Sequence, residues 1–116
     1  TPALTVYYDG GCPICRREIA GYRRVEGAER LDWVDVSTVG DAALGDGLTA
    51  DAAIRRMHVR DAEGHLVDGA AAFARIWSSL PRTRLLGRVA GTRPALAVLE
   101  PAYRLFLKVR PLWRRA

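Results

Sequence analysis

The sequence lacks the long apolar runs and the many cysteines that mark two common classes of protein. Its longest apolar runs, such as 95–99, have five residues, whereas a membrane-spanning helix needs roughly twenty. Only two of the 116 residues are cysteine, too few for a secreted scaffold held together by disulfides. The first residues also lack the basic, apolar and small-residue order of a secretory signal. We therefore expect a cytoplasmic protein without a membrane-spanning helix.

Lysine is almost absent as well, because the chain has one lysine and 17 arginines, with a formal net charge of +5. The charge is −4 in residues 1–68 and +9 in residues 69–116. A basic half is typical of proteins that bind nucleic acid or an anionic membrane, and also of ordinary solvated helices. The sequence shows no helix-turn-helix, zinc-finger or aromatic RNA-binding signature. We predict no nucleic-acid partner.

The length suits a single domain, residues 1–116, with one main core. Residues 4–8 alternate as a half-buried strand does, and a helical pattern follows over 13–25, with Pro13 at the first helical position. Residues 31–36 again read as a strand. A strand, a helix and a strand in this order predict a βαβ unit with parallel strands.

The next segment predicts a loop and a hairpin. Residues 37–51 are rich in glycine and aspartate, and a short helix is expected near 49–54. Strands are expected at 56–60 and 65–68, joined by a four-residue turn, which predicts an antiparallel hairpin. Asp68 is then the expected N-cap of the following helix.

That helix, over residues 69–80, completes an α/β core of order β-α-β-β-α within about residues 1–80. Residues 81–116 form a helical extension, for which three short helices are predicted, separated at Gly91 and Pro101. The segment 96–115 is apolar with a basic end, so an alternative function is an interaction module. It would dock on a membrane or a partner through its basic helices. A helix packed over the sheet is the simpler interpretation.

Cys12 and Cys15 are spaced as a redox pair. Cys12 lies at or just before the N-terminus of the first helix, where unpaired N–H groups and the helix dipole favour a thiolate. Cys15 is one turn further and within reach of a disulfide. The pattern predicts a thiol-disulfide oxidoreductase in which Cys12 attacks a substrate disulfide and Cys15 resolves the mixed disulfide. The substrate is a protein or small-molecule thiol or disulfide, and we expect no organic cofactor because the sulfurs carry the electrons.

Two carboxylates accompany the pair. Asp9 either tunes the nucleophile as a proton acceptor or only shapes the Asp-Gly-Gly turn. Glu18 lies one turn beyond Cys15, where it either handles the Cys15 proton or pairs with a neighbouring arginine.

A metal-binding or metal-transfer module is the competing chemical interpretation. Cys12 and Cys15 together with His58 and His65 would supply a Cys2His2 set. The spacing of the two histidines, one on a strand and one past a turn, does not match the usual arrangements, so we expect no structural metal. Transient metal binding by the two thiolates stays as the alternative.

The segment YYDGGCPICRRE, residues 7–18, resembles the signature of the DCC family, named for an aspartate and two cysteines. The resemblance continues through residues 57–69 and to Pro81. It implies a thioredoxin-like fold and thiol-disulfide oxidoreductase activity, with Asp9, Cys12 and Cys15 as the three name-giving residues. Many thioredoxin-like proteins have a cis-proline before the third strand, whereas residues 53–57 of this chain contain no proline.

Overall fold

A computed structural model of the chain describes residues 4–45 and 47–109. The basic end of the extension predicted from the sequence, with Trp113, Arg114 and Arg115, lies outside these residues.

A four-stranded mixed sheet forms the centre of the fold. Its order is β2 (Leu31–Asp35), β1 (Leu4–Tyr8), β3 (His58–Asp61) and β4 (Leu66–Asp68). β1 pairs in parallel with β2 and antiparallel with β3, and β3 pairs antiparallel with β4. The predicted βαβ unit and the predicted hairpin are both confirmed.

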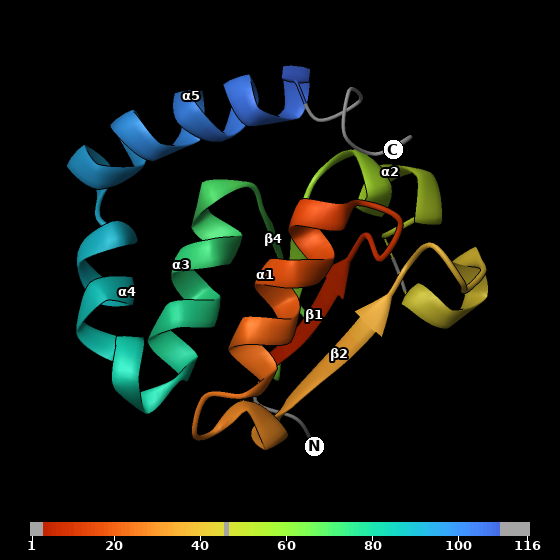
Figure 1. Ribbon diagram of the computed structural model, residues 1–116, viewed down its shortest axis with the longest axis horizontal. Coiled ribbons are helices and arrows are strands. Elements are labelled where there is room, and N and C mark those ends of the chain that lie inside the picture. Colours follow the sequence, from red (N-terminus) through yellow and green to blue (C-terminus); the bar gives the residue numbers. More distant parts are fainter. Residues whose placement is uncertain (1–3, 46, 110–116) are drawn as a thin grey trace.

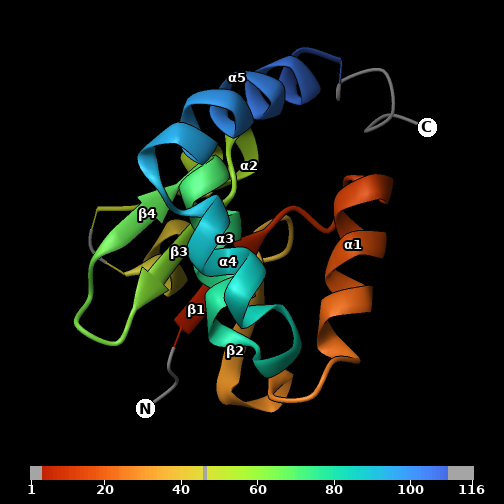
Figure 2. The same ribbon diagram turned by 90° about the vertical axis from the view of Figure 1, so that its left-hand side faces the viewer.

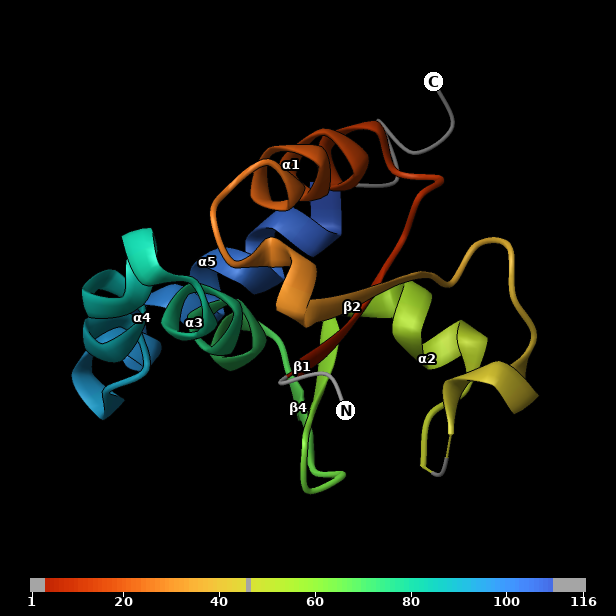
Figure 3. The same ribbon diagram turned by 90° about the horizontal axis from the view of Figure 1, so that it is seen from below.

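Helices cover both faces of the sheet (Figure 3). α1 (Pro13–Arg23) and α3 (Ala70–Ser79) pack on one face, where Ile19 and Ile76 are fully or almost fully buried in the main apolar cluster. α2 (Ala50–Arg55) packs with a second apolar cluster on the other face. The two clusters follow from the alternation of β1, whose successive side chains point to opposite faces. The result is the predicted thioredoxin-like α/β fold.

The extension differs from the prediction. α4 (Arg84–Ala90) ends before Gly91 as expected, but α5 (Arg93–Val109) is one continuous helix with Pro101 inside it. The prediction of two helices separated at Pro101 is therefore wrong. An internal proline costs about 3 kcal/mol, and tertiary contacts on both sides of it, at Glu100 and Tyr103, offset that cost.

α5 runs across the edge of the sheet at which β1 ends and α1 begins (Figure 1). The path from α3 through α4 to α5 brings the C-terminal helix over the start of the first helix. Within the described residues, no helix combines the length and the apolar composition that crossing a bilayer requires.

The start of α3 depends on α5. Asp68 is not its N-cap, contrary to the prediction, because that position belongs to Gly69, whose φ of 69° is in the left-handed region. The Asp68 carboxylate instead accepts a hydrogen bond from Arg56 (3.0 Å). The first N–H of α3, from Ala70, donates to the Glu100 carboxylate of α5 (3.2 Å). The cap is thus supplied from a distant segment, which no local pattern indicates.

Candidate functional site: the two thiols under α5

The loop between β1 and α1 is shaped by Asp9. The Cys12 N–H donates to the Asp9 carbonyl (3.2 Å), and the Gly11 N–H donates to Asp9 Oδ1 (2.9 Å). Asp9 therefore stabilises the turn, as one of its two predicted roles requires. It is only 3 % exposed and also lines a cavity beside Cys15, so its placement suits the second role, proton transfer, as well.

Asp35, at the end of β2, is a part of this site that sequence reasoning missed. Its Oδ1 accepts hydrogen bonds from the Gly10 N–H (2.9 Å) and from Ser37. A Cβ at Gly10 would overlap the Asp35 carboxylate, so the close approach requires glycine. Burial would raise the pKa of Asp35, but the hydrogen bonds from Ser37 and Gly10 and the charge of Arg16 hold that pKa below its ordinary value.

A signal for Asp35 was present in the sequence. The βαβ unit predicts parallel strands, and the carboxyl ends of parallel neighbours meet at one edge of the sheet. In the structure Tyr8 is the register partner of Asp35, so the last residue of β2 lies beside the loop that follows β1.

The two thiols lie together at the start of α1 but differ in exposure. Cys12 is the N-cap residue, and its Sγ accepts a hydrogen bond from the Cys15 N–H (3.4 Å). The two cysteines are not joined in a disulfide. Cys12 is completely buried, with 0 % of its surface exposed, whereas Cys15 is partly exposed. The sequence predicted the placement of Cys12 correctly and did not indicate its burial.

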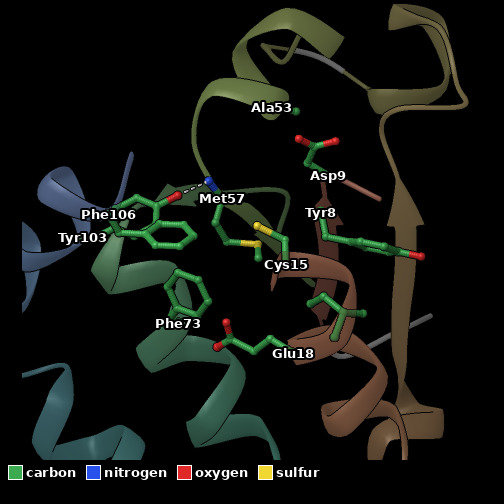
Figure 4. Close-up of a pocket in the computed structure, with 10 residues that line it drawn as sticks. Tyr8, Asp9, Cys15, Glu18, Ala53, Met57, Phe73, Tyr103 and Phe106 are labelled. Carbon is green, nitrogen blue, oxygen red and sulfur yellow. Dashed lines mark hydrogen bonds between the residues drawn. The ribbon is translucent and has the colours of Figure 1, made fainter. Parts of the chain in front are cut away.

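Cys15 lines a cavity of about 20 Å³, which has room for roughly one water molecule. Figure 4 shows the Cys15 side chain pointing into it, with Met57, Phe73, Tyr103 and Phe106 on the far side. Tyr103 and Phe106 come from α5 and stack on each other. The helical extension therefore provides part of the wall around the redox pair.

Met57, directly before β3, occupies the stretch in which the sequence has no proline. Its side chain is nearly buried in the cavity wall. Its backbone N–H donates to the Tyr103 hydroxyl (2.6 Å), as the dashed line in Figure 4 shows. The Tyr103 hydroxyl of α5 thus occupies the backbone donor of Met57.

Glu18 belongs to a hydrogen-bonded chain of side chains. The Tyr22 hydroxyl donates to Glu18 (2.5 Å), and the Trp77 indole N–H donates to the Tyr22 oxygen (3.0 Å). Burial raises the pKa of Tyr22 well above its usual range, and the Glu18 carboxylate raises it further. Neither predicted role of Glu18 includes this tyrosine. Glu18 also lines the Cys15 cavity.

A larger apolar cleft of about 270 Å³ lies between α1, α3 and α5. Figure 2 shows α5 running above α3 and α4 toward the side on which α1 stands. Glu18, Phe73 and Tyr103 line both the cleft and the Cys15 cavity. The remaining walls come from Ala70, Trp77, Leu99 and Ala102. The cleft is therefore adjacent to the Cys15 cavity, and no local sequence pattern indicates it.

The histidines of the metal hypothesis are not at this site. The Nδ1 of His58 lies 2.9 Å from the Arg56 carbonyl, and the exposed His65 lies beside Asp61 on the β3–β4 turn. In the part of the chain that the structure describes, no three histidine, cysteine, aspartate or glutamate side chains cluster as metal ligands would. The Cys2His2 arrangement is wrong for this fold.

Comparison with known proteins gives one match. A family model described as DCC1-like thiol-disulfide oxidoreductase matches residues 6–116. No curated protein and no solved structure matches the chain.

Proposed function

Since the chain belongs to the DCC1-like thiol-disulfide oxidoreductase family, we propose that it catalyses thiol–disulfide exchange through Cys12 and Cys15. The observation that carries the proposal is the placement of two reduced cysteines at the N-terminus of α1, joined by the hydrogen bond from the Cys15 N–H to Cys12 Sγ. A thiolate at Cys12 would receive this N–H and the positive end of the helix dipole. The substrates are thiols or disulfides, in a cytoplasmic setting as the sequence predicts.

The predicted order, with Cys12 attacking first and Cys15 resolving, receives mixed support. The N-cap position of Cys12 favours it because a thiolate is stabilised there. The complete burial of Cys12 opposes it because exchange depends on access to the attacking sulfur.

We assign Asp9 the role of proton acceptor for Cys15, since both line the same cavity. An Asp9→Asn variant keeps the acceptor oxygen for the Gly11 N–H and removes the base. We expect the exchange rate to fall by about 10- to 100-fold, at or below the lower end of general-base effects. The pH profile of the rate should also change, whereas a purely structural role would leave its shape as in the wild type.

The proposed function is tested with the purified full chain. Oxidation should join Cys12 and Cys15 in a disulfide that a dithiol reduces, with mass spectrometry following the loss and return of two hydrogens. Cys12→Ser and Cys15→Ser should each lower the multiple-turnover rate by about 100-fold or more. Each variant lacks the second thiol, which in the wild type attacks the mixed disulfide at a high effective concentration. A wild-type protein that forms no reversible intramolecular disulfide would refute the function.

A second candidate is contact with an anionic membrane surface. Large apolar side chains on α4 and α5, namely Leu85, Leu86, Val89, Val98 and Leu105, are well exposed, and exposed arginines stand beside them on both helices. Such a surface is typical of interfacial helices. Co-sedimentation with vesicles of anionic lipid, lost with neutral lipid, would support it, and no binding at low salt would reject it.

A further inference from the structure

The two thiols differ in what they can reach. Exchange requires the attacking sulfur to contact a sulfur of the substrate. Cys12 has no exposed surface, whereas Cys15 is partly exposed and opens into the cavity under α5. In this conformation a substrate meets Cys15 before Cys12.

The space next to Cys15 has a size that limits the substrate. The cavity itself holds about one water molecule, but the adjoining cleft measures about 270 Å³. An enclosed apolar cavity of about 150 Å³ holds one benzene, so the cleft accommodates one or two rings. A ligand that fills this space is therefore a small molecule.

The residues that line the cleft also determine which kind of ligand it favours. The polar groups at the cleft have partners within the fold: the Tyr103 hydroxyl accepts from Met57, and Glu18 accepts from Tyr22. Glu18 is the one charged residue among the described residues that line the cleft, and the rest of the lining is alanine, leucine and aromatic residues. Its negative charge opposes an anionic ligand, and the walls favour an apolar one.

We propose that Cys15, not Cys12, exchanges with the substrate, and that the substrate is a small, neutral, apolar disulfide bound in the cleft between α1, α3 and α5. The proposal rests on the proposed function of the cysteine pair. It reverses the order of attack predicted from the sequence.

The reaction has two exchange steps. The Cys15 thiolate attacks one substrate sulfur, the substrate S–S bond breaks, and the first half leaves as a thiolate. The Cys12 thiolate then attacks the Cys15 sulfur of the mixed disulfide, which forms the Cys12–Cys15 bond and releases the second half. The substrate gains two electrons and the protein loses two, and the two released thiolates take up the protons that the cysteines lose. An external dithiol returns the protein to its reduced form.

The position of Cys12 suits the reverse step. A thiol that reduces the Cys12–Cys15 disulfide attacks the accessible sulfur, Cys15, and Cys12 is the leaving group. A stabilised thiolate leaves faster, and Cys12 would leave into the N-cap site with the Cys15 N–H aimed at it. The N-cap position, which the sequence suggested for attack, serves a leaving group equally well.

The first experiment compares the two single-cysteine variants. Cys12→Ser keeps a good N-cap residue and leaves only Cys15, while Cys15→Ser leaves only Cys12. Each variant is mixed with the neutral disulfide dithiodipyridine, and the released thiopyridone is followed by absorbance, with mass spectrometry to locate the mixed disulfide. We expect Cys12→Ser to react about 10-fold faster or more, since access governs the rate.

The second experiment tests the cleft with a matched pair on α5. Ala102 lines the cleft, and Ala97 is an exposed alanine of the same helix that does not. In the Cys12→Ser background, Ala102→Trp should slow the reaction with dithiodipyridine by about 10-fold, as expected for a filled pocket, and Ala97→Trp should leave it unchanged. Dithiobis(nitrobenzoate), which carries two carboxylates, should react more slowly than dithiodipyridine after both rates are normalised to free cysteine. Glu18→Gln should narrow that difference.

The outcomes separate the two proposals. A faster reaction of Cys15→Ser than of Cys12→Ser would overturn the reversed order and leave the proposed function intact. The substrate class would be overturned if Ala102→Trp and Ala97→Trp had equal effects on the rate. It would also be overturned if a protein disulfide such as insulin reacted faster than dithiodipyridine, with both rates normalised to free cysteine. Circular dichroism of each variant shows that the compared proteins are folded.

Discussion

The loop before α1 and the helix α5 meet around the same two thiols, but they are held in place in different ways. In the loop, Asp9 hydrogen-bonds to residues two and three positions away, and the Cys15 N–H reaches back three residues to Cys12. A longer contact joins Gly10 of the loop to Asp35, 25 residues further along the chain. The contacts of α5 span far more of the chain, because Glu100 and Tyr103 bind Arg56 and Met57, 44 and 46 residues earlier. The reactive thiols lie on the loop and the start of α1, whereas part of the surroundings of Cys15 comes from α5.

The reactivity of the thiols and the selection of the substrate therefore depend on different parts of the chain. The loop and the start of α1 place sulfur at a helix N-terminus, which any chain with this motif and this βαβ unit can do. The cavity and cleft walls are completed by α5, through Tyr103, Phe106, Leu99 and Ala102. Changes in the loop should therefore alter folding and exchange together, and changes in α5 should alter access while the sheet persists.

Gly10→Ala should disturb the loop before α1 and have the largest effect of the three substitutions. The added Cβ would overlap the Asp35 carboxylate, so the loop or Asp35 must shift and the hydrogen bond from the Gly10 N–H is strained or lost. We expect the free energy of unfolding to fall by about 1–3 kcal/mol, the usual range for overpacking. Urea denaturation measures it.

The matched control is Gly21→Ala on α1, where a Cβ meets no atom within 4 Å. Alanine is the better helix former, so this variant should be as stable as the wild type or more so. Equal stability of Gly10→Ala and the wild type would contradict the close approach of Gly10 and Asp35.

Tyr103→Phe tests how α5 is held against the rest of the fold, and it should lower the free energy of unfolding by less than Gly10→Ala does. The variant keeps the ring contact with Phe73 and removes the oxygen that accepts the Met57 N–H. We expect a loss of about 1 kcal/mol, together with faster hydrogen exchange at the Met57 amide. Tyr8→Phe is the control, since the Tyr8 hydroxyl has no hydrogen bond within the described residues. Unchanged exchange at Met57 in Tyr103→Phe would show that α5 does not hold this amide.

The same contrast explains which parts of the structure could be predicted from the sequence. The strands, α1 and the position of Cys12 follow from periodicity, Pro13 and the Gly-Gly turn, all of which are local signals. The continuous α5 could not be predicted, because Pro101 argues for a break and the opposing contacts at Glu100 and Tyr103 involve residues far away in sequence. The apolar cleft likewise depends on how α5 returns over α1.

Glu100 joins α5 to the rest of the fold through charge. Its carboxylate accepts hydrogen bonds from Arg56, Arg104 and the Ala70 N–H. Burial would raise the pKa of Glu100, but these three partners hold it below its ordinary value of 4.5. A carboxyl group with a lowered pKa in the folded state binds fewer protons there than in the unfolded chain. Its contribution to stability is therefore present above pH 4.5 and is lost as the pH falls through the lower, folded value.

Glu100→Gln should remove this pH dependence and give the smallest change of the three. The amide still accepts from Ala70 but has no charge for Arg56, and both side chains of that ion pair are about a quarter exposed. Solvent screening therefore limits the expected loss to about 0.5–1 kcal/mol at neutral pH. The difference between wild type and variant should shrink as urea denaturation is repeated at pH values below 4.5. The control is Glu29→Gln, at an exposed glutamate in the short 3-10 helix before β2, and its stability difference from the wild type should not shrink at low pH. A stability difference for Glu100→Gln that stays constant with pH would mean that α5 is held by its aromatic contacts and not by this charge.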